Sequence, residues 1–356
     1  MAEGPRLPGL GEGVPPRLLV AGGAGFIGSA FVRLLLGEGR GFSITVLDKL
    51  TYAGNLENLA PVAHHSGYAF VKGDICDGSL VGELAREVDC IVNFAAETHV
   101  DRSILDPGDF IRTDVLGTHR LLEAARQAGH ARFVQVSTDE VYGDVLAPRR
   151  SREGDQLSPR SPYSASKASG DLLCFAYHAT YGLGVLVTRG SNTYGPYQYP
   201  EKIVPLFVTQ ALQQRPLPVY GDGTAVRDYL YVDDHARGIA TVLARGRAGE
   251  AYNLGRGDEP VSGLRVAETV LQLAGGDRSL IQPVRDRPGH DRRYALDSAS
   301  AKALGWSPEV AFDEGMAATV RWYEEHRGWW EPIKSGEFLE FYRRNYHPVA
   351  GPAPAS

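Results

Sequence analysis

The sequence predicts an α/β fold: a doubly wound parallel sheet joined to a smaller C-terminal lobe. The length of 356 residues suits one large domain plus a lobe. Short apolar runs alternate with helical patterns, which is typical of βαβ units around a buried parallel sheet. After residue 189 this alternation weakens, because five prolines fall between residues 196 and 218. A smaller lobe is therefore expected to begin near residue 190.

Strands and helices are predicted in order along the first half of the chain. We expect strands at 17–21, 44–47, 69–72, 90–94, 133–136 and 185–188. Helical periodicity predicts two long helices, at 110–128 and 163–181. A further strand at 229–232, followed by a helix to residue 244, is expected to return to the sheet.

These patterns also predict how the chain divides. The sheet domain is expected at 17–190, with the return segment at 228–250, and the lobe at 191–227 and 251–345. Prolines crowd both ends of the chain, so we expect mobile tails at 1–16 and 346–356.

The composition is that of an ordinary globular protein, with 43% hydrophobic and 22% charged residues. The net charge of −6 argues against a nucleic-acid-binding or anionic-membrane surface. No apolar run reaches the roughly 18 residues of a membrane-spanning helix. Cys76, Cys90 and Cys174 form no Cys-x-x-Cys pair, so we expect neither a disulfide framework nor a metal site. They indicate a reducing, cytoplasmic setting.

Three glycines lie between the first predicted strand and the helix that follows it. Gly22, Gly25 and Gly28 permit a tight turn, close approach of a pyrophosphate to backbone N–H groups, and packing of the helix on the strand. Asp48 ends the next strand, where a carboxylate binds the ribose hydroxyls of a dinucleotide. Together they indicate a Rossmann-type sheet. The acid favours NAD, and Lys49 beside it leaves NADP as the alternative.

Tyr163 and Lys167 are four residues apart on a predicted helix and so share one face. A free tyrosine has a pKa near 10, too high for a base at neutral pH. A nearby ammonium and a cationic nicotinamide would both favour the phenolate, so we expect the pKa of Tyr163 to be lowered. The alternative is an ordinary pair on an amphipathic helix. Downstream of a dinucleotide loop, the catalytic interpretation is favoured.

Asp139 and Glu140 follow a predicted strand at the sheet edge where ligands bind. Neighbouring carboxylates repel, so one can keep its proton while the other is ionised. An acid and a base together suit the elimination of water. The alternative is a solvated acidic turn. Neighbours on a strand point to opposite faces, so both carboxylates can face a cleft only if the strand ends at Thr138.

With Pro162, these features resemble the extended short-chain dehydrogenase/reductase family over about residues 17–330. Further segments are similar to the dTDP-glucose 4,6-dehydratases within it. They are 48–55 (DKLTYAGN), 95–103 (AAETHVDRS), 138–143 (TDEVYG), 192–198 (NTYGPYQ), 200–202 (PEK), 227–232 (RDYLYV) and 286–294 (DRPGHDRRY). In related epimerases small residues replace the pair at 139 and 140, and in decarboxylases and GDP-mannose dehydratases Ser usually replaces the Asp. The pair is thus the discriminator.

The resemblance implies a reaction cycle on dTDP-glucose with tightly bound NAD. Tyr163 takes the proton of the C4 hydroxyl as hydride passes from C4 to NAD. The C4 ketone acidifies the C5 hydrogen, Glu140 removes that proton, and Asp139 protonates the C6 hydroxyl, which leaves as water. Hydride then returns to C6 and a proton to C5, giving dTDP-4-keto-6-deoxyglucose. Thr138 is expected to bind the C4 oxygen, and Lys167 the nicotinamide ribose.

The resemblance also implies the binding residues. The cofactor site would comprise Gly22, Gly25, Phe26, Ile27, Gly28, Asp48, Lys49, Leu50, Thr51, Asp74, Ile75, Phe94, Ala95, Ala96, Thr113, Tyr163 and Lys167. The substrate site would comprise Thr98, Thr138, Asn192, Lys202, Pro218, Tyr220, Arg227, Ser262, Arg287 and His290. Among these, Arg227 and Arg287 are the best candidates for the diphosphate, because guanidinium binds phosphate through a fork of N–H groups.

Three positions depart from the family pattern: Thr98 replaces Ser, Tyr229 replaces Trp, and Ser262 stands where many relatives have Asn. The last leaves open whether dTDP or UDP is preferred. Two other interpretations remain: a 4-epimerase or UDP-sugar dehydratase on the same scaffold, and a non-catalytic NAD-binding regulator. The resemblance further implies a homodimer, joined through the two long helices.

Overall fold

The structure, a computed structural model, describes residues 16–37 and 41–346. Apart from Pro16 and Tyr346, the tails predicted at 1–16 and 346–356 lie outside the described residues. Tyr346 lies within the described residues and contacts two tyrosine rings. Its ring packs 5.6 Å from that of Tyr220 and 4.9 Å from that of Tyr342, centre to centre.

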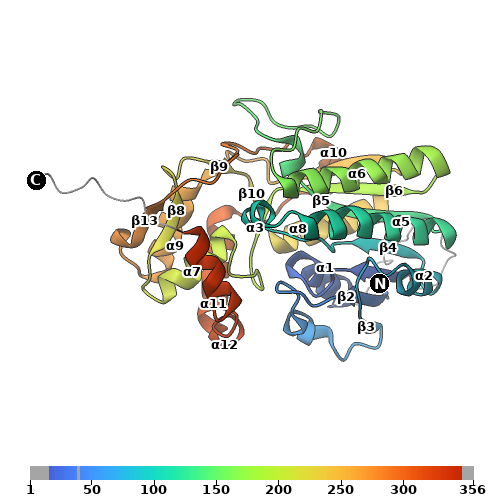
Figure 1. The fold of residues 1–356 in the computed structure, drawn as a ribbon, viewed down its shortest axis with the longest axis horizontal. Helices are drawn as coiled ribbons and strands as arrows, with labels where there is room; N and C mark the ends of the chain where they lie inside the picture. Colours follow the sequence, from blue (N-terminus) through green and yellow to red (C-terminus); the bar gives the residue numbers. More distant parts are fainter. Residues whose placement is uncertain (1–15, 38–40, 347–356) are drawn as a thin grey trace, which may run out of the picture.

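A seven-stranded parallel sheet forms the centre of the larger part, which confirms the predicted fold class (Figure 1). The strand order is β11-β6-β5-β4-β1-β2-β3. Its strands are β1 (Arg17–Ala21), β2 (Ser43–Asp48), β3 (Tyr68–Lys72), β4 (Cys90–Asn93), β5 (Arg132–Thr138), β6 (Val185–Gly190) and β11 (Glu250–Leu254). The order reverses between β1 and β4, the switch point at which such sheets bind ligands.

The strand that returns to the sheet is β11, which lies beyond most of the predicted return segment 228–250. The predicted strand at 229–232 is instead β10 (Tyr229–Tyr231), which pairs with β7 (Asn192–Tyr194) outside the main sheet. β11 reads Glu-Ala-Tyr-Asn-Leu and pairs in parallel with β6. Its mixed polar and apolar composition differs from the apolar runs that marked the other strands, because it is an edge strand.

Helices cover both faces of the sheet (Figure 1). α1 (Phe26–Gly37) and α8 (Val232–Arg245) pack together on one face, and α2 (Gly78–Arg86), α5 (Thr118–Gln127) and α6 (Pro162–Tyr181) on the other. Strand residues alternate between the two cores: Leu18 and Val20 belong to the first, Leu19 and Ala21 to the second. This alternation is what two covered faces require.

The smaller lobe packs around a hydrophobic core of its own, at the other end of the molecule (Figure 1). It is built on α7 (Ile203–Leu212), α9 (Gly263–Ala274) and α11 (Phe312–Glu325), with β8 (Leu217–Tyr220) and β13 (Ile281–Val284) paired beside them. Trp330, Tyr194 and Tyr323 are among its fully buried side chains. The remaining elements are α3 (Val100–Leu105), α4 (Gly108–Phe110), α10 (Ala299–Ala303), α12 (Arg327–Trp330), α13 (Glu337–Asn345), β9 (Val226–Arg227), β12 (Val261–Ser262), and the short turns η1 (Leu56–Val62), η3 (Asp139–Tyr142) and η4 (Arg278–Leu280).

The helix predicted at 110–128 is not one regular α-helix. It begins as α4, widens into the π-helical turn η2 (Ile111–Gly117) and continues as α5. Within η2 the carboxylate of Asp114 is buried and accepts hydrogen bonds from the Ser166 hydroxyl at 2.6 Å and the Glu97 N–H at 2.8 Å. Gly117 lies against Ile75, where an added Cβ would come within 2.4 Å of Ile75 Cδ1. Wide turns of this kind are frequent at functional sites.

Candidate active site

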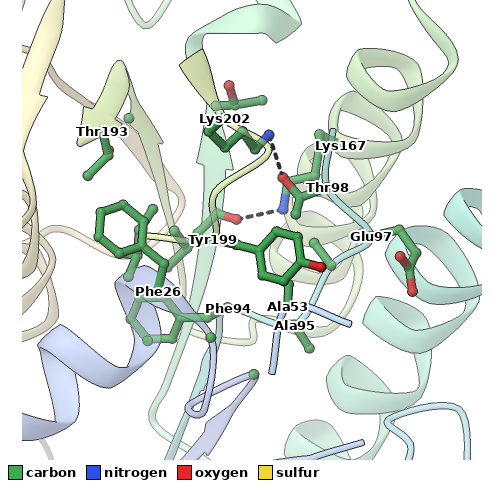
Figure 2. A pocket seen from close by; sticks show the side chains of 18 of the residues that line it. Phe26, Ala53, Phe94, Ala95, Glu97, Thr98, Lys167, Thr193, Tyr199 and Lys202 are labelled. Atoms are coloured by element: carbon green, nitrogen blue, oxygen red, sulfur yellow. Dashed lines mark hydrogen bonds between the residues drawn. The ribbon is translucent and has the colours of Figure 1, made fainter. Parts of the chain in front are cut away.

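One cleft opens at the carboxyl edge of the sheet, where β1, β4, β5 and β6 end. We call it the active-site cleft. It runs from the glycine loop after β1 to Lys202, at the start of α7. Figure 2 shows side chains from distant segments converging there, among them Phe94, Lys167 and Lys202. Ligands of parallel sheets bind at this edge.

The glycine loop fits closely against its neighbours. Gly22 has φ of +75°, and a Cβ there would meet the backbone nitrogen of Ala95 at 2.4 Å. At Gly28 a Cβ would meet the carbonyl oxygen of Gly22 at the same distance, so α1 can start only if this residue has no side chain. The loop therefore leaves its N–H groups and the start of α1 open to an anion. This is the arrangement that a dinucleotide pyrophosphate requires.

Asp48 is held at the end of β2 by two backbone N–H groups. Its Oδ2 accepts from Ala24 at 2.9 Å and its Oδ1 from Leu50 at 2.8 Å. Burial raises the pKa of this carboxyl group, and the two N–H donors oppose the shift. Lys49 forms an ion pair with Asp74 at 2.9 Å. Its charge is thus partly matched by a protein carboxylate.

Sixteen of the seventeen predicted cofactor residues line the active-site cleft. They are Gly22, Gly25, Phe26, Ile27, Gly28, Asp48, Lys49, Thr51, Asp74, Ile75, Phe94, Ala95, Ala96, Thr113, Tyr163 and Lys167. The exception, Leu50, is not among the lining residues, although its backbone N–H positions Asp48. The glycine loop and the acid at the strand end fit NAD.

β5 ends at Thr138, and both carboxylates therefore face the cleft. Thr138 caps the turn η3, its hydroxyl accepting from the N–H of Glu140 at 3.3 Å. Asp139 and Glu140 are the first two residues of η3 and both line the cleft. Because η3 is helical, its side chains do not alternate between faces as strand side chains do. The condition set by the sequence, a strand that ends at residue 138, is met.

The two carboxyl groups differ in their electrostatic surroundings. Burial raises the pKa of Asp139 well above its ordinary value, and the charge of Glu140 adds to the shift. Burial also raises the pKa of Glu140, but the cations of Arg287, Lys202 and Arg227 oppose it. Asp139 Oδ2 is buried and has no hydrogen-bond partner among the described residues. Asp139 is thus suited to hold a proton and Glu140 to accept one.

Tyr163 and Lys167 are both buried on the first turns of α6. Ser161 and Ser164 cap this helix reciprocally, and Pro162 is its first residue. Lys167 Nζ donates to the carbonyl oxygen of Val136 at 2.8 Å (Figure 2). In the protein without NAD, burial raises the pKa of Tyr163 well above 10, and Glu140 and Asp114 add to the shift; the predicted lowering, which depends on the nicotinamide charge, stays a prediction. Only the hydroxyl of Thr138 lowers it.

The predicted substrate residues fall into two groups. Thr98, Thr138, Asn192 and Lys202 line the active-site cleft, and Lys202 Nζ donates to Thr98 Oγ1 at 3.0 Å (Figure 2). The others do not line it and belong to the lobe: Pro218, Tyr220, Arg227, Ser262, Arg287 and His290. Sequence order alone gives no distance between the lobe and the sheet, so it cannot separate the two groups.

Side chains of the second group are engaged by protein partners. Arg287 pairs with Asp101 at 3.4 Å, and the same carboxylate accepts from the hydroxyl of Tyr220 at 2.8 Å. Arg227 donates to the carbonyl oxygen of Asp291 at 2.8 Å. His290 lies 2.6 Å from a carboxylate oxygen of Asp286. Ser262 caps α9, its hydroxyl accepting from the N–H of Arg265.

Several cleft residues were not among the predictions. They are Glu97, Ser137, Thr193, Gln198, Tyr199, Glu201 and His235. Glu97, Thr193, Gln198 and Glu201 lie within the segments that carry the resemblance, so those segments were the available signal, whereas Ser137, Tyr199 and His235 lie outside them. His235 had none, because a lone histidine on a helix is usually structural. It is 1% exposed, its Nδ1 lies 2.7 Å from the hydroxyl of Thr193, and burial lowers its pKa to about 4.

Neither a metal site nor a membrane span is found in the described part of the chain. Residues 16–37 and 41–346 contain no group of three or more His, Cys, Asp or Glu side chains placed to hold a metal ion. Within the same residues, no helix is both long and apolar enough to cross a bilayer.

Comparison with known proteins places this site in a family. Residues 19–319 match the family model described as GDP-mannose 4,6 dehydratase. The chain belongs to this family. A curated member, dTDP-glucose 4,6-dehydratase from Streptomyces niveus, is 52% identical over 324 residues, which is 90% of this chain and 96% of the relative.

Solved structures of similar proteins have the same fold. The dTDP-glucose 4,6-dehydratase of Streptomyces venezuelae, solved with NAD and dTDP bound, has a TM-score of 0.86 and 52% identity, over 89% of this chain and all of the other. The UDP-glucose 4-epimerase of Thermus thermophilus in complex with NAD has a TM-score of 0.81 but only 35% identity, covering 87% of this chain and 99% of the other. The family thus includes more than one reaction on this scaffold.

Proposed function

We propose that the protein is an NAD-dependent hydro-lyase that converts dTDP-glucose to dTDP-4-keto-6-deoxyglucose. The observation that carries the proposal is the pair Asp139–Glu140 on η3, both in the cleft with Tyr163 and in different electrostatic surroundings. Relatives about half identical over most of the chain are named for this reaction. A 4-epimerase is disfavoured, because it needs no acid–base pair for loss of water.

Each reactive side chain has one task in this proposal. NAD, when bound, accepts hydride from C4 and later returns it to C6. Tyr163 takes the proton of the C4 hydroxyl, with Thr138 hydrogen-bonding the same oxygen. Glu140 removes the C5 proton, and Asp139 donates its proton to the C6 hydroxyl, which leaves as water; a proton returns to C5 as hydride reaches C6. Because the free protein raises the pKa of Tyr163, the phenolate has to be favoured by the positive charge that NAD brings.

The cofactor residues named above are proposed to hold NAD through the glycine loop and Asp48. For the nucleotide sugar, we propose Thr98, Asn192 and Lys202 at the sugar. Further out, Pro218, Tyr220, Arg227, Ser262, Arg287 and His290 would hold the diphosphate and base. Support comes from Glu140: the positive charges of Arg287, Lys202 and Arg227 all oppose the rise in its pKa, so these cations face one region. Binding of the diphosphate requires Arg287 to exchange Asp101 for phosphate.

The division of the chain follows from its cores. We propose a Rossmann domain at 17–190 with 228–254 returning to it, and a substrate-binding lobe from the rest up to 345. The extension beyond residue 250 rests on β11, a strand of the main sheet. A cytoplasmic location is also proposed. Cys76, Cys90 and Cys174 are free thiols, which suits a reducing compartment.

A single assay separates the candidate functions. Purified protein is incubated with dTDP-glucose, and the products are examined for the alkali-induced absorbance of a 4-keto-6-deoxy sugar. We expect this product and no galactose isomer. A galactose isomer without the keto sugar would instead identify an epimerase. Binding of NAD with no product from dTDP-glucose or UDP-glucose would identify a regulator. A parallel incubation with UDP-glucose measures the nucleotide preference.

A further inference from the structure

A buried polar chain of four residues lies directly under the turn that carries the carboxylates. It consists of Asp171 on α6, Arg189 on β6, Tyr142 at the end of η3 and Asn253 on β11. All four are at most 5% exposed. None of them lines the active-site cleft. We name them the η3 support.

Continuous hydrogen bonds join its members. Arg189 Nε donates to Asp171 Oδ2 at 2.8 Å, and Arg189 Nη1 donates to the Tyr142 hydroxyl at 2.8 Å. That hydroxyl donates in turn to Asn253 Oδ1 at 2.8 Å. Asn253 Nδ2 donates to the carbonyl oxygens of Ser151 and Asp297. The Tyr142 oxygen is therefore fixed from two sides, by one donor and one acceptor.

The register of the sheet aligns Arg189 and Asn253 with Ser137, which is separated from the turn η3 by one residue. Ser137 on β5 is paired with Arg189 on β6, and Arg189 with Asn253 on β11, so the three form one row across the sheet. The next residue of β5 is Thr138, after which η3 begins. Figure 1 shows α6, which carries Asp171, Tyr163 and Lys167, over β5 and β6. The η3 support thus links the turn to the helix that carries the tyrosine and lysine.

A buried ion pair of this kind is a poor source of stability, because its desolvation cost offsets its attraction. Its effect is geometric: with its hydroxyl fixed, Tyr142 anchors the far end of η3. The next residue, Gly143, is equally confined, since a Cβ there would meet the carbonyl oxygen of Ser158 at 2.3 Å. The N–H of Ser158 donates to the carbonyl oxygen of Val141 within η3. The turn is thus held at its end as well as at its cap.

We infer that the η3 support is a positioning device for water elimination, holding Asp139 and Glu140 in place without touching substrate. The inference rests on the proposed function. Hydride transfer from C4 depends on Tyr163 and Lys167, which the Tyr142 hydroxyl does not contact. Elimination depends on the carboxylates that η3 carries. Loosening the turn should therefore slow the second step much more than the first.

The test is Tyr142→Phe, followed by stopped-flow absorbance at the NADH band during a single turnover of the NAD-loaded enzyme with dTDP-glucose. The variant loses one oxygen atom and both of its hydrogen bonds. We expect NADH to form within about twofold of the wild-type rate. Its decay should be slower by about tenfold to a hundredfold, the usual effect of a small misplacement of reacting groups. Bound NADH then accumulates.

The matched control is Tyr252→Phe. Tyr252 precedes Asn253 on β11 and is also buried, and its hydroxyl makes two hydrogen bonds, with the N–H of Arg247 and with Glu250. It contacts no part of η3. This change costs the same hydroxyl but should leave both phases at the wild-type rate. Arg189→Lys is a second variant: it keeps a charge for Asp171 but cannot also reach Tyr142, and should repeat the Tyr142→Phe pattern.

Equal slowing of both phases in Tyr142→Phe and Arg189→Lys would overturn the inference, and so would an unchanged ratio of the two rates. Slow NADH decay in the Tyr252→Phe control would overturn it too, because general loosening of the sheet would then be the cause. Wild-type protein that forms neither NADH nor keto sugar contradicts the proposed function instead, so the two failures are distinguishable.

Discussion

Glu140 and Asp139 are neighbours in the chain, yet their surroundings separate their roles. Three cations oppose the rise in the pKa of Glu140, while Glu140 itself raises that of Asp139. Glu140→Gln removes the base and keeps the shape. We expect C4 oxidation to continue and loss of water to fall by at least about a hundredfold. Absorbance of protein-bound NADH checks this, and full dehydratase turnover would remove Glu140 from the role of base.

Tyr163 acts before either carboxylate in the proposed sequence. Tyr163→Phe keeps the buried ring, which packs 6.2 Å from Phe110, but loses the group that accepts the C4 proton. We expect NADH formation to fall by a factor of about a hundred or more, with NAD still bound. Rapid mixing with dTDP-glucose measures the rate, and retained NAD, quantified after denaturation, shows that the site is intact. Unaltered NADH formation would contradict the assignment.

α8 contributes a titratable residue, His235, whose charge the fold disfavours. Burial lowers its pKa to about 4, against about 6.5 in an unfolded chain. Folding stability from this group is therefore fully present above pH 6.5 and is lost as the pH falls toward 4, because the unfolded chain binds the proton first. The full loss is about 3 kcal/mol.

His235→Asn keeps an atom near the Thr193 hydroxyl and removes the titration. We expect the variant to be less stable than the wild type at pH 7, because of the lost ring volume. The difference in melting temperature should narrow as the pH is lowered from 7 to 4.5. Calorimetry at several pH values measures it. A difference that stays constant with pH would mean that His235 does not titrate as its burial requires.

At the scale of elements, the sequence predicted what local patterns encode. The glycine loop, Asp48 and the Tyr163–Lys167 pair each depend on neighbours in the chain, and the structure brings them into one cleft. β11 escaped prediction because its composition is only half apolar. The π-helical turn η2 was not predicted, because it depends on tertiary contacts with Ser166 and Ile75. No local sequence pattern indicates these contacts.

The electrostatics of the site were harder to predict than its membership. From the sequence, Lys167 was expected to lower the pKa of Tyr163, but the fold directs its ammonium to the carbonyl oxygen of Val136. Likewise, no local pattern predicted that Arg287, the expected partner of a diphosphate, also pairs with Asp101. Burial and partner choice depend on segments far apart in the chain, so residue types alone could not supply them.

At the scale of the whole molecule, an apolar strip crosses the helical layer formed by η2 and α6. Ile111 and Leu116 on η2 and Leu172 on α6 are 55%, 43% and 60% exposed. The two elements pack against each other. Exposed apolar surface of this kind marks an interface, and we propose that a second copy of the chain covers it.

Leu172→Arg tests this assembly. A buried, unpaired guanidinium at the interface should shift the protein from two chains to one, as measured by light scattering across a range of concentrations. Leu273→Arg is the matched control. Leu273 is 41% exposed but lies on α9 in the lobe, away from η2 and α6, so this variant should remain a dimer. A wild-type protein that is a monomer at every concentration would refute the dimer.

The position of η3 bears on how such a scaffold changes its reaction over evolution. Thr138, Asp139 and Glu140 are consecutive residues at the exit of one strand, whereas the cofactor loop follows a different strand. Substitutions confined to that exit can alter what happens to the oxidised sugar and leave the binding of dinucleotide untouched. New activities can therefore arise from substitutions at a few positions. No evolutionary intermediate then has to lose its bound cofactor. The constraint on such divergence lies beneath the turn, in the residues that support it.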